Sequence, residues 1–328
     1  MSTAQGICAL KLAAIVSGGD APGINTALYH FAALAAQNGD RIIGVQGGFP
    51  GLLEEKFQPL LPKALLPWSA MPGSLLASSR VPVLSEADAR AKLAEVLRRN
   101  QIDGLIMFGG DGTLRHIPPL LRSWGVACVG IPTTIDNDVP GSEYTLGFDS
   151  ACNFALPIID GVRATGAALE GRIFTVETLG GTAGFLALEI ARAAGADAVA
   201  LPEYKADINH ICARLRSAVE HKGQALLVYT EGVANKDELL SAIPQQTGIR
   251  VRSTLLGHAQ RGGSPTHRDR AFAAQAARAG YEALRAGRMM SMTVIQEGRF
   301  ALHDGDLSAF APRPPDISLY NALNHLEG

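Results

Sequence analysis

The sequence contains little cysteine, few aromatic residues and no excess of either charge, and each shortage argues against a class of protein. Its four cysteines lie far apart and form no CxxC or Cys/His pattern, which argues against a disulfide scaffold and a structural zinc site. Because 29 basic residues balance 31 acidic ones, a nucleic-acid binder held by bulk phosphate attraction is also excluded. We therefore expect a protein of a reducing compartment with no nucleic-acid partner.

Long hydrophobic runs are missing too. The longest uncharged stretch, residues 21–39, carries two asparagines, a histidine and a glutamine. It is therefore too polar for a bilayer span, which needs about 20 predominantly apolar residues. The N-terminus lacks a cationic segment, and its apolar run at residues 12–16 is too short for a signal peptide. We expect a cytoplasmic protein that makes no membrane contact.

The sequence does contain many apolar residues, 47% of the total, in short runs that alternate with longer amphipathic stretches. Continuous apolar runs are typical of strands buried on both faces of a parallel sheet. This alternation predicts an α/β protein with doubly wound, mainly parallel sheets, and 328 residues suffice for about two domains. The predicted strands are residues 12–16, 41–45, 104–108, 127–131, 173–177, 198–201, 225–230 and 292–295. The predicted helices include 85–100, starting at a Ser85 cap, 182–194, 235–246 and 268–286, which Gly287 would end. The Pro-rich stretch after Phe310 is expected to be extended.

Two loops that follow predicted strands combine paired glycines with an aspartate. The first, SGGDAPGIN at Ser17–Asn25, lets backbone N–H groups approach an anion, although a plain tight turn explains it equally well. The second, FGGDGT at Phe108–Thr113, adds a carboxylate, whose oxygen atoms Mg²⁺ favours. Because ligands bind beyond the carboxyl ends of parallel strands, both loops are candidate phosphate sites.

Two further motifs carry charged side chains. In IPTTIDNDVPG, Ile131–Gly141, one aspartate could accept a hydroxyl proton while the other helps to hold a metal, or the run could form a simple turn. In VRSTLLGHAQRGGSP, Val251–Pro265, two arginines and a histidine lie close together. Arginine binds phosphate in a bidentate manner, so this motif predicts a phosphate clamp, although a lone arginine usually forms a surface ion pair.

Together the ordered motifs SGGDAPG, GGDGT, TIDND and LGHAQRGGSP resemble those of the phosphofructokinase family, over nearly the whole chain. GGDG alone also occurs in NAD kinases and diacylglycerol kinases, but TIDND and GHAQRGG do not belong to those patterns. The resemblance implies the glycolytic, Mg²⁺-dependent phosphorylation of fructose 6-phosphate at its 1-hydroxyl, with ATP as the donor. It also implies an active site in a cleft between two domains. Residues 1–143, rejoined by about 256–310, would bind the donor, and residues 144–255 would bind the sugar phosphate.

On the donor side, the resemblance implies roles for specific residues. Asp111 matches the aspartate associated with Mg²⁺ and is the expected metal ligand. Gly18 matches a backbone donor near the transferred phosphoryl group, and Arg80 matches an arginine that stabilises the charge there. Asp136 matches the general base, with Thr134 and Asp138 beside it as further expected catalytic residues. The expected donor-binding residues are Gly18, Arg80, Val81, Gly110, Asp111, Gly112 and Thr113.

On the sugar side, His258 and Arg261 match the clamp on the 6-phosphate, and Glu231 matches a carboxylate at the sugar hydroxyls. Arg172 and Arg252 match arginines that reach the same phosphate from a neighbouring subunit, which implies a homo-oligomer, a dimer or tetramer, with shared active sites. The expected substrate-binding residues are Thr134, Ile135, Asp136, Arg172, Leu179, Gly180, Gly181, Glu231, Arg252, His258, Ala259, Gln260 and Arg261.

Some positions depart from the family pattern. Gly181 stands where the family usually has an arginine, which leaves another sugar phosphate open as the acceptor. Gly112 matches ATP-dependent members, because pyrophosphate-dependent ones usually carry aspartate there, whereas Thr133 matches neither type. His116 stands where ATP-dependent members have a glycine against adenine. The alternatives are therefore a pyrophosphate-dependent enzyme, a kinase for another sugar phosphate, and a non-catalytic regulatory subunit. The last is disfavoured because the base, the metal ligand and the charge-stabilising arginine are all present.

The first predicted helix lacks the arginines with which allosteric bacterial members of the family bind an effector phosphate. No arginine lies between Gly23 and Gly39. We therefore expect weak or absent control by nucleoside diphosphates or phosphoenolpyruvate.

Overall fold

The computed structural model describes residues 9–80, 83–305 and 307–326, and the chain forms two compact units. Unit 1 contains the residues up to Thr134 together with Val139–Gly147 and Ser264–Ala311. Unit 2 contains Ile135–Asp138, Phe148–Gly263 and the residues from Pro312 onward. Each unit has its own, mostly parallel sheet covered by helices, which confirms the predicted α/β class.

The sheet of unit 1 has seven strands in the order β11-β10-β5-β4-β1-β2-β3. Strands β10, β5, β4, β1 and β2 pair in parallel, and the antiparallel strands β11 and β3 form the two edges. The chain places β2 on one side of β1 and β4 on the other, so the order reverses at β1. The elements of unit 1 are β1 (Lys11–Ser17), α1 (Ile24–Gln37), β2 (Arg41–Val45), α2 (Gly48–Leu53), β3 (Phe57–Pro59), α3 (Pro62–Leu65), η1 (Leu66–Trp68), η2 (Val83–Ser85), α4 (Ala87–Arg99), β4 (Gly104–Gly109), α5 (Asp111–Ser123), β5 (Ala127–Pro132), α10 (His267–Arg285), β10 (Met290–Gln296), β11 (Arg299–Asp304) and η4 (Leu307–Ala309).

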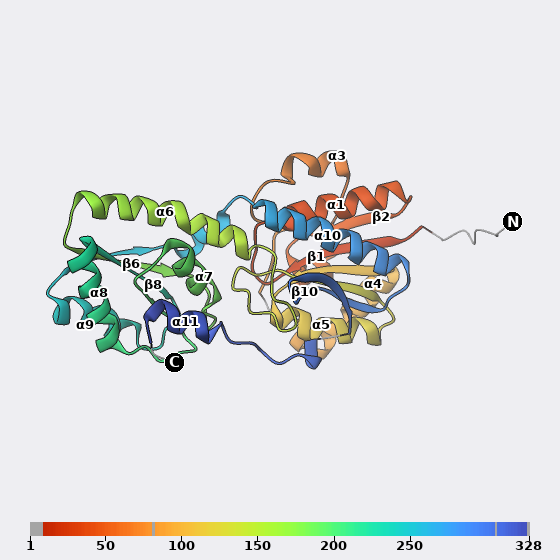
Figure 1. Ribbon diagram of the computed structural model, residues 1–328. Helices are drawn as coiled ribbons and strands as arrows, with labels where there is room; N and C mark the ends of the chain where they lie inside the picture. Colours follow the sequence, from red (N-terminus) through yellow and green to blue (C-terminus); the bar gives the residue numbers. More distant parts are fainter. Residues whose placement is uncertain (1–8, 81–82, 306, 327–328) are drawn as a thin grey trace. The chain divides into compact units, whose positions relative to one another are not determined.

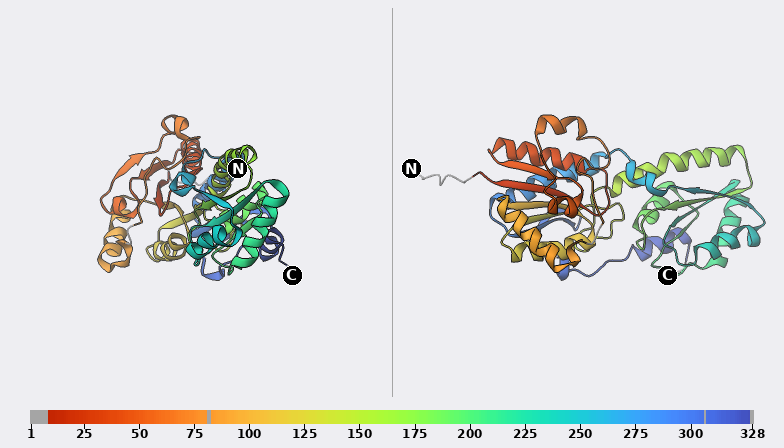
Figure 2. Two further views of the ribbon diagram at one scale, coloured as in Figure 1. Left: turned by 90° about the vertical axis from the view of Figure 1, so that its left-hand side faces the viewer. Right: turned by 180° about the vertical axis from the view of Figure 1, so that it is seen from behind.

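Helices cover both faces of this sheet, as Figures 1 and 2 show. Helices α1 and α10 pack against each other on one face, while α2, α4 and α5 cover the other. There Phe49, Leu93 and Leu121 from the three helices join buried strand residues in one apolar cluster. Because both faces are covered, β4 and β5 are buried at every residue, which explains their continuous apolar sequences.

The sheet of unit 2 has four parallel strands in the order β7-β8-β6-β9. Helices α8 and α9 pack on one face, and α6 and α7 lie against the other. The order reverses at β6, which pairs with β8 on one side and β9 on the other. The elements of unit 2 are α6 (Phe148–Ala168), β6 (Arg172–Thr178), α7 (Phe185–Ala194), β7 (Ala198–Ala200), α8 (Ile208–Lys222), β8 (Gln224–Thr230), α9 (Lys236–Thr247), β9 (Arg250–Leu255), η3 (Gly257–Gly262) and α11 (Ile317–Asn324).

The predicted ends of two helices have different outcomes. The predicted cap at Ser85 is wrong, because α4 begins at Ala87 and its N-cap is Glu86, which makes no side-chain capping bond. The predicted stop at Gly287 is confirmed. Gly287 follows α10 with a φ of 71°, a left-handed conformation that favours glycine, and donates its N–H to Leu284 O.

The C-terminal segment is only partly extended. Residues 311–316 form neither helix nor strand, and the prediction of an extended stretch is wrong for α11. The carboxylate of Asp316 accepts hydrogen bonds from the backbone N–H groups of Ser318, at 2.8 Å, and Leu319, at 3.2 Å, and so caps this helix. Within the described part of the chain, no helix is long and apolar enough to cross a bilayer.

Candidate active site

The two glycine loops of unit 1 meet where the strand order reverses. Strands β1 and β4 are parallel neighbours, and Ser17 pairs with Gly109 at their carboxyl ends. The Thr113 hydroxyl, in the first turn of α5, lies 3.0 Å from the Ser17 hydroxyl. Gly18 has a φ of 105°, a conformation that few residues other than glycine adopt. The structure therefore brings both predicted phosphate loops to one edge of the sheet.

The residues before Arg80 are held against the end of β1. The Ser78 hydroxyl donates to Gly18 O at 2.7 Å, and Ser79 forms an isolated bridge with Ser17. The N–H of Gly18 donates to Ser79 O at 3.1 Å. These bonds place Arg80 beside the first glycine loop. They also occupy the Gly18 amide, which sequence analysis predicted to bind a phosphoryl group.

A pocket of about 710 Å³ lies at this edge of the sheet. Four of the predicted donor-binding residues line it: Gly18, Arg80, Gly112 and Thr113. Apolar side chains from α2, η2 and α5 supply one part of the wall, and His116, Arg90 and three serines supply another. The remaining lining residues are Ser17, Phe49, Ser79, Leu84, Ser85, Arg90, His116, Ile117 and Leu120. The pocket thus combines a glycine backbone and arginines with an apolar wall, which suits a nucleotide.

Asp111 begins helix α5, next to the pocket but outside its lining. Its carboxylate is paired with Arg115, one helical turn later, with Arg115 Nη2 2.8 Å from Asp111 Oδ1. Among the described residues, no group of three or more His, Cys, Asp or Glu side chains could form a metal cage. Mg²⁺ rarely uses such cages and is usually bound by one or two carboxylates together with substrate phosphates. A single aspartate beside a pocket lined by glycines and arginines therefore fits Mg²⁺.

The aspartates of the TIDND motif lie in unit 2, in a short segment at Ile135–Asp138. Asp136 is half-buried in a turn, and Asp138 is exposed. Asn137 between them is buried, with a left-handed φ of 56°, and its carbonyl accepts a hydrogen bond from Arg313 Nη2 at 3.2 Å. The Arg313 guanidinium in turn lies over the ring of Phe185, at 4.3 Å. The Pro-rich C-terminal segment therefore contacts and stabilises the aspartate turn.

Thr134, the residue before the aspartate turn, belongs to unit 1 and forms a hydrogen bond within that unit. Its carbonyl accepts a hydrogen bond from the hydroxyl of Thr145 at 2.6 Å. The preceding Thr133 is buried and donates its hydroxyl to Ile131 O at 2.8 Å.

The loop after β6 carries the predicted sugar-binding residues of unit 2. The N–H of Gly181 donates to Glu231 Oε1 at 3.2 Å, so Glu231 faces this loop from the end of β8. The N–H of Leu179 donates to Gln260 Oε1 at 2.9 Å, and Gln260 is fully buried. Gly232 approaches the Gly181 carbonyl so closely that a Cβ atom there would lie 1.8 Å from it. The structure thus brings Leu179, Gly180, Gly181, Glu231 and Gln260 together.

The predicted phosphate-binding residues lie on β6, on the edge strand β9 and on the segment that follows β9. Arg172, on β6, pairs in register with Arg250 at the start of β9. Arg252 is exposed on β9, whose other side has no partner strand in the described sheet. His258, Ala259 and Arg261 lie on η3, immediately after β9. Gly110 is the N-cap of α5 in unit 1, and Val81 lies outside the described residues.

Sequence analysis missed three residues that shape these sites: Arg90 and Phe49 in the pocket, and Arg313 behind the aspartate turn. Arg90 lies within an amphipathic helix, where a basic residue is ordinary. Only the tertiary structure brings these residues to the motifs, and no local signal in the sequence identifies them.

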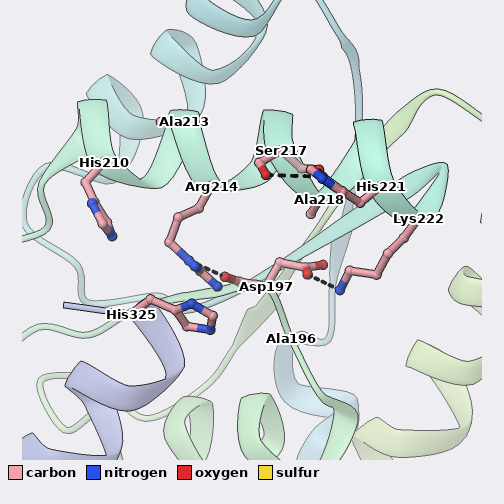
Figure 3. A pocket seen from close by; sticks show the side chains of 10 residues that line it. All are labelled: Ala196, Asp197, His210, Ala213, Arg214, Ser217, Ala218, His221, Lys222 and His325. Atoms are coloured by element: carbon pink, nitrogen blue, oxygen red, sulfur yellow. Dashed lines mark hydrogen bonds and ion pairs between the residues drawn. The ribbon is translucent and has the colours of Figure 1, made fainter. Parts of the chain in front are cut away.

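A second pocket, of about 640 Å³, lies in unit 2 between α8, β7 and the end of the chain (Figure 3). Basic side chains dominate its lining, and several of them contact other protein groups. Lys222 forms an ion pair with Asp197, and Arg214 Nε donates to the Asp197 carbonyl at 2.9 Å. His210 Nε2 lies 2.7 Å from the carbonyl of Asn324. These contacts fasten β7 and α11 to α8.

Comparison with known proteins agrees with the motifs. The sequence profile of the family described as phosphofructokinase matches residues 11–285. An ATP-dependent 6-phosphofructokinase of Lysinibacillus sphaericus is 37% identical over 317 residues, covering 96% of this chain and 99% of the relative. The ATP-dependent 6-phosphofructokinase of Coxiella burnetii is 35% identical, over 89% of this chain and 90% of its own.

Solved structures agree on the fold. Phosphofructokinase from Pichia pastoris superposes with a TM-score of 0.85 at 24% identity, over 92% of this chain and 37% of its own. A pyrophosphate-dependent phosphofructokinase from Marinobacter aquaeolei superposes with a TM-score of 0.82 at 21% identity, over 97% of this chain and 90% of its own. At these identities the likeness concerns the fold alone.

Proposed function

The chain belongs to the phosphofructokinase family, and on that premise we propose that it transfers the terminal phosphoryl group of ATP to the 1-hydroxyl of fructose 6-phosphate. The products are fructose 1,6-bisphosphate and ADP, and the reaction is that of a glycolytic 6-phosphofructokinase. The observation that carries this proposal is the 37% identity to an ATP-dependent enzyme over 96% of the chain, with all four sequence motifs at the carboxyl ends of strands.

We assign the pocket of unit 1 to the donor. The glycine backbones at Gly18, Gly110 and Gly112 allow close approach of the phosphates, and the Thr113 hydroxyl lies beside them. Arg80 stabilises the charge that develops during transfer, because phosphoryl transfer depends mainly on positioning and charge neutralisation. The Gly18 amide can donate to the phosphoryl group only if it exchanges its present partner, Ser79 O. Gly112 leaves the pocket free of a carboxylate that would repel ATP.

Asp111 would hold Mg²⁺ together with the donor phosphates. When bound, the ion neutralises charge on the phosphates during transfer. The N-terminal position of Asp111 on α5 suits its carboxylate, because a negative charge is stabilised at the positive end of a helix.

Asp136 acts as the general base that takes the proton from the sugar 1-hydroxyl. Thr134, Ile135 and Asp138 surround it in the sequence and complete the acceptor loop. Arg313 supports the turn from behind by its bond to Asn137 O.

The sugar phosphate is bound by residues of unit 2. Glu231 contacts the sugar hydroxyls, beside the loop Leu179–Gly181. The clamp on η3, His258 to Arg261, binds the 6-phosphate, with Gln260 as the buried anchor of that segment. Arg252 is exposed on the edge strand β9, and the partly exposed Arg172 lies at the start of the neighbouring strand β6, positions that suit arginines that serve the site of a neighbouring subunit. We therefore propose a homo-oligomer, a dimer or tetramer, with shared active sites.

Replacement of the base tests this assignment. In Asp136→Ser, kcat should fall by about 10² or more, while the dissociation constant for fructose 6-phosphate stays within about twofold of wild type. Asp160→Ser, at an exposed position on α6, is the matched control and should leave both quantities unchanged. Wild-type turnover in Asp136→Ser would remove Asp136 from the mechanism. Failure of the wild type to form fructose 1,6-bisphosphate would refute the proposed function itself.

Pyrophosphate is the second candidate donor, and His116 is the observation that favours it. Its imidazole lines the pocket, where a glycine would leave more room for a base. Another sugar phosphate is the second candidate acceptor, because Gly181 supplies no side chain to the sugar end of the site.

A further inference from the structure

Arg115 engages the carboxylate of Asp111 from one helical turn away. Arg115 Nη2 lies 2.8 Å from Asp111 Oδ1, and Arg115 Nε lies 3.4 Å from Asp111 Oδ2. An aspartate N-terminal to an arginine at this spacing is the favourable order for a pair on a helix. The guanidinium therefore faces both oxygen atoms of the carboxylate that would otherwise be open to a cation.

The pair is partly shielded from water and lies next to the donor pocket. The Arg115 side chain is 28% exposed and that of Asp111 36%. The neighbouring residues Gly112, Thr113 and His116 face the pocket, whereas Asp111 and Arg115 are on an adjoining face of the same helix. The site thus presents a neutral pair, and not a bare carboxylate, to an approaching cation.

A neutral pair attracts a divalent cation much less than a carboxylate does, because the guanidinium charge opposes the cation at close range. Nucleotide phosphates change this balance. They bring negative charge to the same place, and a guanidinium released from Asp111 has phosphate oxygens as alternative partners.

We propose that Arg115 is a positioning residue that holds Asp111 in this pair and makes the carboxylate available to a divalent cation only when the cation arrives with the donor phosphates. The inference rests on the proposed function, because it takes the donor to be a metal–nucleotide complex. A purely structural role for Arg115 would stabilise α5 slightly and would leave cation binding unchanged.

Binding of Mn²⁺, followed by electron paramagnetic resonance, tests the proposal without turnover. In Arg115→Met, the dissociation constant for free Mn²⁺ should fall by about fivefold or more, because the opposing charge is gone. Arg115→Lys keeps a cation at this position and should remain near wild type. Arg122→Met removes the same charge from the last turn of α5, far along the helix from Asp111, and should also match wild type.

A second titration measures the coupling to nucleotide. With the non-hydrolysable analogue adenylyl imidodiphosphate bound, the advantage of Arg115→Met over wild type in Mn²⁺ affinity should disappear. The double variant Asp111→Asn/Arg115→Met should lose the gain seen without nucleotide.

Two results would overturn the proposal. One is an Arg115→Met variant that binds free Mn²⁺ no more tightly than Arg122→Met does, even if its melting temperature is lower. The other is a gain that persists in the double variant, which would place the cation elsewhere. Neither result depends on activity, so the failure of this proposal is distinguishable from failure of the proposed function, which is decided by product formation in the wild type.

Discussion

The hydroxyl of Thr113 lies 3.0 Å from the hydroxyl of Ser17, although 96 positions separate the two residues in the sequence. The contact joins the first turn of α5 to the end of β1, and it forms because β1 and β4 are parallel neighbours whose carboxyl ends share one edge. Two glycine loops that are distant in the sequence thus become one pocket.

Gly112→Asp tests why the donor is ATP. A Cβ atom at Gly112 would meet no other atom within 4 Å, so a side chain fits and the change is mainly one of charge. A carboxylate beside the phosphates should lower kcat/KM for ATP by about tenfold or more. Steady-state kinetics of Gly112→Asp and of the uncharged, equally large Gly112→Asn separate the effect of charge from the effect of side-chain bulk. An equal loss in both variants would show that bulk, and not charge, decides.

His116→Ala tests how the pocket treats the adenine base. The imidazole shares the pocket with Phe49, Leu84 and Leu120, an arrangement suited to stacking on a planar base. Loss of an aromatic contact should raise KM for ATP by about 3- to 10-fold. KM for fructose 6-phosphate is the internal control and should not change. A lower KM for ATP in the variant would mean that the imidazole crowds the base instead.

Asp40 should stabilise the folded protein by an amount that depends on pH. Its side chain is fully buried, and burial by itself would raise its pKa. Hydrogen bonds from Tyr281, the Leu10 N–H and Arg285, together with the Arg285 charge, outweigh burial and lower the pKa of Asp40 below its ordinary value. A lowered folded-state pKa means that this stabilisation is complete above the unfolded pKa, about 3.9, and is lost as pH falls through the folded pKa.

Asp40→Asn should therefore reduce the free energy of unfolding by about 2–4 kcal/mol between pH 5 and 8, because it leaves a guanidinium without its carboxylate. Below about pH 4 the difference from wild type should narrow. Urea denaturation of the variant and the wild type at pH 7, 5, 4 and 3 measures the loss of stability and how it changes with pH. Asp304→Asn is the control, because its ion pair with Arg288 is exposed and should be worth less than about 1 kcal/mol. A difference that does not change with pH would contradict the account of Asp40.

Effectors should have little influence on this enzyme. Helix α1 has no arginine, and burial lowers the pKa of its only histidine, His30, so that the imidazole is neutral at pH 7. We expect that GDP or phosphoenolpyruvate, added when ATP is saturating, changes the fructose 6-phosphate concentration at half-saturation by less than about twofold. Allosteric coupling usually produces a change of roughly 5- to 150-fold. A large shift would show that another basic surface binds the effector.

The sequence predicts the buried parts of the fold well and the exposed parts poorly. Strand β2 occupies the predicted residues, because it lies between other strands in an apolar layer. Strand β9 is not among the predicted strands, because an edge strand with mostly exposed residues has neither an apolar run nor strict alternation. Helix α11 is not predicted, because the prolines before it indicate an extended segment, although Asp316 is an ordinary N-cap.

The residues of the candidate site also differ in how well the sequence predicts them. Glycine loops and aspartates at strand ends carry a local signal, so the sequence predicts Gly112 and Thr113, which line the pocket, and Asp111, which lies beside it, as candidate residues. Arg313 and Arg90 could not, because their importance comes from residues that only the folded chain brings to them. The i, i+4 spacing of Asp111 and Arg115 is visible in the sequence, but spacing alone does not show whether the carboxylate pairs with the arginine or stays open to a metal ion.

The central claim is that the enzyme uses ATP to phosphorylate fructose 6-phosphate. Initial rates with fructose 6-phosphate and Mg²⁺, measured in parallel with ATP and with pyrophosphate, test it most directly. The account predicts formation of fructose 1,6-bisphosphate with ATP and none above background with pyrophosphate. Turnover with pyrophosphate alone would contradict it, because Gly112 would then not determine the donor and His116 would close the pocket to adenine.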